Sequence, residues 1–377
     1  MTDFQLYEIV FLVVVAILTH NVAAKYKLQL VGDFYSYYNQ KTNIGYQVAL
    51  LLMVVLALVI GFRAEDGNFS DSLNYRTYYY RFYEGFPFIF DVNAENKIFD
   101  NLFAWWGSLR LGISNFFFLM DVIYFGCIYA ACKRLFPKDT LIAYLCYLGA
   151  FSTFSYSCNG IKAGVAASIF LLALSYYKNW PVCILLVLVS WGFHHSMILP
   201  VVAFVLSYCY KKPKIFFYGW AFCMLMAALH VSFFQVLFAG LTSDERAVDY
   251  LIADSSSGWE GKAGFRLDFI LYSAMPVLVG YYAIFKKNIK SDMYNILLKT
   301  YLTSNAIWML CMYVQFNNRI AYLSWFLYPI VLIFPLLNAS WGSTQLKTLS
   351  KVVLCHLWFT LLMNLVYYGG LRKILGI

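Results

Sequence analysis

The chain has 377 residues, of which 62% are hydrophobic and only 12% are charged. This excludes a soluble globular protein, whose residues are nearer half apolar and a quarter charged. The net charge of +9 does not indicate nucleic-acid binding, because most of the basic excess lies in short connections between apolar runs, where it sets orientation in a membrane.

The apolar runs predict an all-α polytopic membrane protein. Each run is long enough to cross about 30 Å of hydrocarbon. The first run lacks a basic flank and a small-residue cleavage site, so we interpret it as a retained helix and not as a signal peptide. We expect a single transmembrane domain over 1–377 with about 12 spans. They cover roughly 5–22, 46–62, 113–131, 140–157, 160–177, 180–193, 195–210, 215–239, 267–285, 294–315, 319–337 and 348–367.

The connections between spans fall into two alternating sets, and one set is strongly basic. By the positive-inside rule this set is cytoplasmic, and its only acidic residues are Asp33, Asp139 and Asp292. Its basic residues are Lys25, Lys27, Lys41, Lys133, Arg134, Lys138, Lys178, Lys211, Lys212, Lys214, Lys286, Lys287, Lys290, Lys347 and Lys351.

The opposite, outer face receives two long loops, at about 63–112 and 241–266. In the first loop, Ser70 and Asp71 predict the N-cap of a short helix and Gly85 predicts its end. Tyrosines along this helix suit the headgroup layer. A second interfacial helix is expected at 96–112, where Trp105 and Trp106 favour the water boundary.

Polar residues with functional potential begin directly after the second span. Arg63 suits an anion clamp, because its guanidinium presents a planar fork of donors to phosphate oxygens. The alternative is an arginine that merely reaches the interface. Arg76, interleaved with tyrosines, offers further anion or sugar contacts, whereas the alternative for this helix is an aromatic belt without function.

The tight turn between the spans at 140–157 and 160–177 holds Asn159 and Lys162. We expect Asn159 to cap the next helix. Lys162 in the first helical turn opposes the helix dipole and is poorly placed for structure alone, whereas an anionic ligand would benefit from both the lysine and the free N–H groups. Gly160 and Gly164 are more typical of close helix packing.

His194 and His195 follow a short apolar run, which places them at or below the outer interface. Ionisable groups at that depth are functional candidates, here as a base or a donor, although either histidine alone also fits a structural role. Arg319, Tyr322 and Arg266 are expected on the same outer face, with Arg319 also explicable as an interface anchor.

The sequence resembles the EpsG family of exopolysaccharide-assembly membrane proteins, which is related to Wzy-like O-antigen and capsule polymerases. The motifs that carry the resemblance are F-R-A-E-D-G-N-F-S-D-S-L-N-Y, N-G-I-K-A-G-V-A-A-S-I-F-L-L-A-L, F-H-H-S-M-I-L-P and N-R-I-A-Y-L. The family typically has Arg where Lys162 stands and Ala where Met197 stands. A lysine cannot make the bidentate contact of an arginine, which weakens the carry-over to Lys162.

The resemblance implies a GT-C-like glycosyltransferase that works at the outer face of a bacterial cytoplasmic membrane. Its implied substrate is an oligosaccharide repeat unit on undecaprenyl pyrophosphate, transferred to another lipid-linked repeat unit, with a chain-length-regulating or export protein as a further partner. No cofactor, metal or nucleic acid is expected. Candidate catalytic residues are His194, His195 and Asp66. Candidate substrate-binding residues are Arg63, Asp71, Tyr75, Arg76, Tyr79, Asn159, Lys162, Arg266, Arg319 and Tyr322.

Three alternatives stay open. A glycosyltransferase that uses a polyprenyl-phosphate sugar would also place acids in the first outer loop, as at Glu65 and Asp66, and commonly needs a metal. A lipid-linked-sugar flippase or transporter needs polar residues along a path through the membrane, where only Asp121 and Lys299 are expected. A histidine-dependent acyltransferase needs a donor route from the cytoplasm, for which no polar track is visible.

Overall fold

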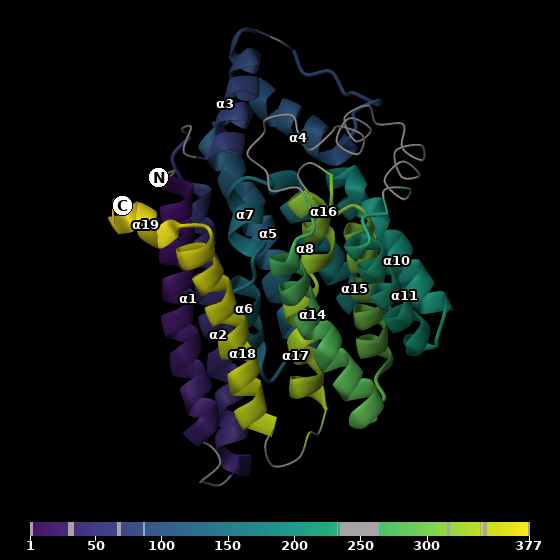
Figure 1. Cartoon of the computed structure of the whole chain (residues 1–377). Coiled ribbons are helices and arrows are strands. Elements are labelled where there is room, and N and C mark those ends of the chain that lie inside the picture. Colours follow the sequence, from purple (N-terminus) through teal and green to yellow (C-terminus); the bar gives the residue numbers. More distant parts are fainter. Residues whose placement is uncertain are drawn as a thin grey trace. The chain divides into compact units, whose positions relative to one another are not determined.

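The computed structural model describes residues 3–28, 34–65, 69–85, 87–231, 233, 264–314, 317–339, 341 and 345–375, and these ranges contain helices and no strand. Short π-helical turns at Tyr282–Lys286 and Met363–Tyr367 extend α14 and α18, and a 3-10 turn covers His195–Met197. The helices (Figure 1) are α1 (Asp3–Leu28), α2 (Phe34–Gly61), α3 (Ser70–Tyr83), α4 (Lys97–Ser108), α5 (Ile113–Leu135), α6 (Thr140–Leu148), α7 (Thr153–Cys158), α8 (Ile161–Ser175), α9 (Trp180–Phe193), α10 (Ile198–Cys209), α11 (Pro213–Ala228), α14 (Leu267–Tyr281), α15 (Asp292–Leu310), α16 (Asn317–Trp325), α17 (Tyr328–Asn338), α18 (Gln345–Leu362) and α19 (Gly370–Leu375).

The described helices are those of a membrane protein. Five stretches are long and apolar enough to cross a bilayer: Phe4–Ala23, Ile113–Leu135, Leu267–Lys286, Asn317–Asn338 and Gln345–Tyr367. Shorter apolar helices overlap five of the other seven expected spans: Gly45–Gly61, Ile161–Ser175, Trp180–Phe193, His195–Cys209 and Pro213–Ala228. The prediction of an all-helical membrane protein is therefore confirmed, whereas the number of spans stays a prediction.

The chain forms two compact units. Unit 1 comprises Met1–Met197 and Leu336–Ile377, and unit 2 comprises Ile198–Pro335. The predicted single domain over 1–377 stays a prediction, and all but the last residues of the expected loop at 241–266 lie outside the described part of the chain.

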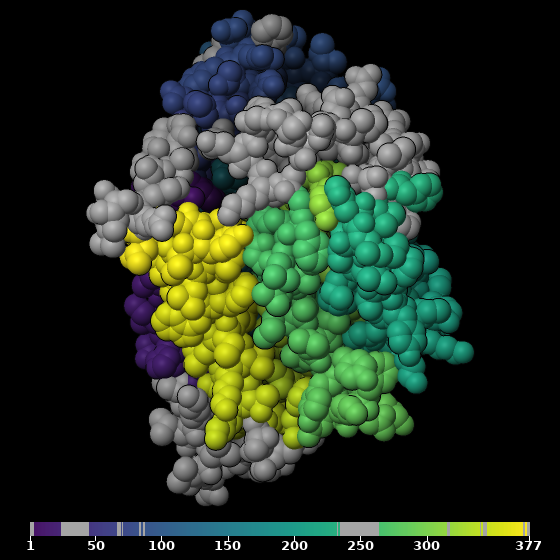
Figure 2. All heavy atoms as spheres, in the orientation of Figure 1, coloured from purple at the N-terminus to yellow at the C-terminus, as the bar shows by residue number. Residues whose placement is uncertain are grey.

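Unit 1 is built around α5, which packs against α2 and α8, while α8 contacts α9 and α1 contacts α18. Its outward faces are apolar, with Val59 of α2, Leu185 of α9 and Trp358 of α18 all exposed. Figure 2 shows the side chains of α18 (yellow) on the surface of unit 1. Such surfaces are unusual on soluble monomers and suit contact with lipid.

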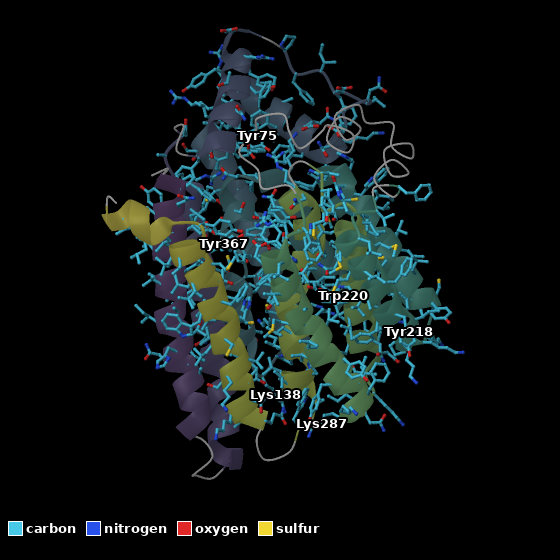
Figure 3. All side chains as sticks on the ribbon, in the orientation of Figure 1. Tyr75, Lys138, Tyr218, Trp220, Lys287 and Tyr367 are labelled. Carbon is cyan, nitrogen blue, oxygen red and sulfur yellow. The ribbon has the colours of Figure 1, made fainter. Side chains whose placement is uncertain are left out.

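The two ends of unit 1 differ. Helices α3 and α4 lie at one end, together with the beginning of α1 and with α19 (Figure 1). Lys138, in the connection between α5 and α6, lies at the other end, far from Tyr75 of α3 (Figure 3). The first long loop and a predicted cytoplasmic connection therefore occupy opposite ends of this unit.

Unit 2 is organised around α15, which packs against α10, α11 and α16. Asn305 of α15 is fully buried, accepts from Trp220 Nε1 at 2.8 Å, and donates to Ser273 Oγ at 3.1 Å and Ser324 Oγ at 3.0 Å. These bonds join four helices, because each partner comes from a different one. Polar groups shielded from water need such partners.

The predicted span at 140–157 is two helices and not one. A turn of four residues separates α6 from α7. Side chains stabilise the turn between the two helices. Thr153 Oγ1 donates to the Tyr147 carbonyl at 2.7 Å, and the Tyr124 hydroxyl donates to the Thr153 carbonyl at 3.1 Å. An interruption within an apolar run is tolerated where neighbouring groups satisfy the freed backbone in this way.

The two expected helices of the first long loop are present as α3 and α4. Helix α3 ends at Tyr83, so the predicted end at Gly85 is confirmed. Gly85 has φ +97°, a left-handed conformation that glycine favours after the end of a helix. The expected cap by Ser70 and Asp71 is wrong, because Phe69 is the N-cap and no side chain caps the helix. Asp71 instead lies in the first turn, where its charge complements the helix dipole.

Candidate functional site

The candidate residues of α3 are held by aromatic packing. The ring of Tyr75 lies 5.8 Å from those of Phe99 and Phe103 on α4. Tyr79 is buried, and its hydroxyl accepts from the Gly112 N–H at 2.7 Å. Arg76 donates to the Glu65 carbonyl at 3.1 Å. Tyr79 and Arg76 thus help to hold α3 in place.

Arg63 lies inside unit 1 and is only 8% exposed. Its Nε donates to Ser72 Oγ at 3.2 Å, and its Nη1 donates to Asp121 Oδ2 at 3.2 Å and to the Ile60 carbonyl at 3.0 Å. Its Nη2 donates to the Cys158 carbonyl at 3.2 Å, at the end of α7. The guanidinium therefore joins α2, α3, α5 and α7. It also forms the ion pair of the buried Asp121.

Lys162 at the start of α8 meets a carboxylate from α4. Its Nζ lies 2.6 Å from Asp100 Oδ1, and both side chains are about one-third exposed, at 27% and 32%. Asp100 supplies the negative charge that this helix N-terminus favours. The position of Lys162 is therefore explained by a protein group, and the partly exposed pair is also open to an anionic ligand.

The histidine pair lies beside the first turn of α4. Helix α9 ends at Phe193, as the sequence predicts, and His194 is in extended conformation. His195 donates its backbone N–H to Asn96 Oδ1 at 3.1 Å, and its Nδ1 lies 3.1 Å from Glu95 Oε1. The two imidazoles stack with centroids 5.1 Å apart.

These contacts form one continuous polar cluster, because Asp100 Oδ2 also accepts from the Asn96 N–H at 3.1 Å. A cation, two carboxylates, an amide and two imidazoles come together from the starts of α4 and α8 and from the turn after α9. We call it the α4 cluster; its members are Glu95, Asn96, Asp100, Lys162, His194 and His195.

An aromatic layer separates the α4 cluster from Arg63. Lys162 Nζ lies 5.0 Å from the ring centre of Phe99, and Arg63 lies 4.5 Å from that of Phe117. Tyr75 touches both rings. Phe99 therefore connects the partly exposed Tyr75 with Lys162 of the α4 cluster.

The expected cap of α8 by Asn159 is wrong. Gly160 is the N-cap, and Asn159 has the helical conformation of the residue that ends α7. The Asn159 Oδ1 atom is buried without a hydrogen-bond partner. The close helix packing expected of the glycines is present, since a Cβ at Gly164 would lie 2.6 Å from the Tyr156 carbonyl oxygen.

Three candidate residues belong to unit 2. Arg266 forms a two-pronged pair with Asp268, at 2.9 Å and 2.6 Å, and lies over the ring of Phe269. Arg319 is exposed in the first turn of α16. Tyr322 packs against Trp325 with centroids 5.6 Å apart. Their roles in substrate binding stay predictions.

Asp66 lies outside the described residues. Among the residues that the structure does describe, no group of three or more His, Cys, Asp and Glu side chains has the arrangement of a metal site.

The sequence alone did not single out Glu95, Asn96 or Asp100. Acidic and amide residues at the start of a helix are ordinary complements to its dipole, so nothing local distinguishes them. Their link to Lys162 and His195 arises only when α4 packs against α9 and α8 is brought alongside.

A known protein family matches most of the chain. The model of the EpsG family matches residues 46–371, which is nearly the whole chain. No curated protein and no solved structure matches the chain.

Proposed function

The chain belongs to the EpsG family, and we propose on this basis that it is a membrane glycosyltransferase that polymerises a polysaccharide. The proposed substrate is an oligosaccharide repeat unit on undecaprenyl pyrophosphate, and the acceptor is a sugar hydroxyl of another lipid-linked repeat unit. The proposed site of transfer is the outer face of the cytoplasmic membrane, within a GT-C-like architecture of about 12 spans.

The observation that carries this proposal is the α4 cluster. A lysine and two histidines belong to one polar cluster at one end of unit 1, and Phe99 connects the lysine with the partly exposed Tyr75. Transfer from a lipid pyrophosphate needs a cation for the leaving group, a group that takes the hydroxyl proton, and surfaces on which sugars stack. Lys162, the histidine pair and Tyr75 meet these needs in that order.

The deep charged residues also support a transferase over a transporter. Asp121 pairs with Arg63 within unit 1. Lys299 of α15 donates to the Ser207 and Tyr210 carbonyls within unit 2, where a cation complements the end of α10. Both charges thus have structural partners of the kind that fixed helix packing requires, and neither is needed to explain a path for a polar substrate.

Elongation by the purified protein tests the proposal. Full-length protein in lipid nanodiscs, supplied with synthetic polyprenyl-pyrophosphate repeat units, is expected to lengthen the glycan. Gel electrophoresis measures the glycan length. Lys162→Gln is expected to lower the rate by about 10²-fold, because a donor to the developing negative charge is lost. Lys138→Gln, at the opposite end of unit 1, is the matched control and should keep the wild-type rate.

Three results would contradict the proposal. No elongation by the wild-type protein would remove the polymerase function. Elongation only from a polyprenyl-monophosphate sugar would establish the alternative donor class. A Lys162→Gln rate equal to that of Lys138→Gln would remove Lys162 from the site.

A further inference from the structure

The contacts of the two histidines of the α4 cluster favour opposite tautomers. His194 Nδ1 accepts from the Ser196 N–H at 3.2 Å, so in the neutral ring the proton lies on Nε2. His195 Nδ1 faces two acceptors, Glu95 Oε1 at 3.1 Å and Asn96 Oδ1 at 3.3 Å, so its proton lies on Nδ1. The neutral His195 ring therefore carries its acceptor lone pair on Nε2, and the neutral His194 ring does not.

Glu95 and Asn96 both contact Nδ1 of His195. Asn96 holds the backbone of His195 through its N–H, and Glu95 holds the ring through Nδ1. A carboxylate on one ring nitrogen sets the tautomer and stabilises the imidazolium that forms when the other nitrogen takes a proton. The side chains of His195 and Glu95 are 36% and 45% exposed, so a substrate can reach the pair from outside unit 1.

We propose that His195 Nε2 is the base that accepts the proton of the acceptor hydroxyl, and that Glu95 is the residue that positions it. This inference rests on the proposed function and deepens it, because it names one of the two histidines and adds a carboxylate that the sequence did not single out. His194 is the neighbour that donates from Nε2 and does not take the proton.

The proposed step transfers the donor sugar to the acceptor hydroxyl and moves the hydroxyl proton to His195. The acceptor hydroxyl oxygen forms a bond to the anomeric carbon of the donor sugar, and its proton moves to His195 Nε2. The bond between the anomeric carbon and the pyrophosphate oxygen breaks, and the electron pair leaves with the lipid pyrophosphate beside Lys162. The imidazolium next to Glu95 then returns its proton to solvent, which restores the neutral base.

The first turn of α4 fixes the spacing between base and cation. Asn96 binds His195, and Asp100 binds both the Asn96 N–H and Lys162. The leaving-group cation and the base are therefore held by one rigid helical turn, as a site that orients two reactants requires.

Kinetics of four variants test the proposal in the elongation assay. His195→Gln and Glu95→Ala are each expected to lower kcat by about 10²-fold or more with KM changed less than about twofold, because a base and its positioning group act on the chemical step. Glu95→Asp should recover part of the loss. Glu84→Ala, an exposed carboxylate at the end of α3, is the control with wild-type kcat.

The double variant Glu95→Ala/His195→Gln separates positioning from general damage. If Glu95 acts through His195, the double variant should be no slower than His195→Gln alone. Losses that multiply would overturn the assignment, as would full activity of either single variant while the wild type elongates. Failure of the wild type to elongate would instead overturn the proposed function.

A second measurement does not depend on activity. Nitrogen-15 NMR of histidine-labelled full-length protein in bilayers distinguishes the two tautomers, and His194→Gln and His195→Gln assign the signals. We expect His195 protonated on Nδ1, His194 protonated on Nε2, and a change of the His195 signal in Glu95→Ala. A His195 ring protonated on Nε2, or unaffected by Glu95→Ala, would overturn the positioning role.

Discussion

Arg63 and Asp121 form a buried ion pair with side chains only 4% and 2% exposed. Both charges have left water, so each depends on the other and on the surrounding acceptors. Lys162 and Asp100 form a pair of the opposite kind, partly exposed and open to ligands. Arg63, expected as an anion clamp, thus connects four helices inside unit 1. The partly exposed cation in the α4 cluster is Lys162.

The two ion pairs should differ sharply in their contribution to stability. Arg63→Ala or Asp121→Asn is expected to lower the free energy of unfolding by about 3–5 kcal/mol, because the remaining charge stays buried without its partner. Arg63→Met/Asp121→Leu should recover most of that loss. Thermal unfolding of the purified protein measures both.

Asp100→Asn is the control for that comparison. Removing one member of a partly exposed pair should cost less than about 1 kcal/mol. Equal losses for Asp100→Asn and Asp121→Asn would contradict the difference in burial between the pairs.

At the scale of elements, the contact of α7 with α8 positions the start of α8. Helix α7 is short and ends at Cys158, and α8 begins three residues later. Gly164 allows the backbone of Tyr156 to approach α8, since no side chain fits between them. The place of Lys162 next to α4 therefore depends on a close approach of two backbones.

A methyl group at Gly164 should disturb this contact. Gly164→Ala is expected to destabilise the protein by about 1–3 kcal/mol, because the obstructing atom is a backbone oxygen that cannot rotate away. Gly126→Ala is the matched control on α5, where a Cβ meets nothing within 4 Å. The control should be neutral or stabilising by up to about 1 kcal/mol.

Thermal unfolding of both alanine variants checks this prediction, and elongation shows whether the site follows. A Gly164→Ala protein as stable as Gly126→Ala would contradict the close packing of α7 and α8.

At the scale of the whole molecule, the two ends of unit 1 carry different chemistry. Helices α3 and α4 with the α4 cluster lie at one end, and the connection that holds Lys138 lies at the other (Figures 1 and 3). The apolar length of α5 separates them. If unit 1 spans the membrane, the α4 cluster and the basic connection face opposite compartments.

Cysteine labelling in intact cells tests this orientation. In a background with Cys209→Ser and Cys355→Ser, a membrane-impermeant maleimide is expected to label Glu84→Cys at once and Lys138→Cys only after permeabilisation. Cys209 and Cys355 are replaced because they are the exposed ones among the nine native cysteines. The reverse pattern would invert the orientation, and labelling of both sites in intact cells would contradict their location at opposite ends.

The sequence by itself determined the class of the protein and several of its elements. Long continuous apolar runs predict helices in a membrane, because a helix satisfies its backbone hydrogen bonds within one segment. The end of α9 at Phe193, the stop of α3 before Gly85 and the membership in the EpsG family all follow from local residue patterns.

Only the tertiary structure decided which side chains meet. Asp121 is 58 residues from Arg63, Asp100 is 62 from Lys162, and Asn96 is 99 from His195. Such pairs depend on which helices pack together, and helical periodicity says which face is apolar but not which neighbour covers it. Packing therefore buried Arg63 at a junction of helices and assembled the α4 cluster from three separate segments.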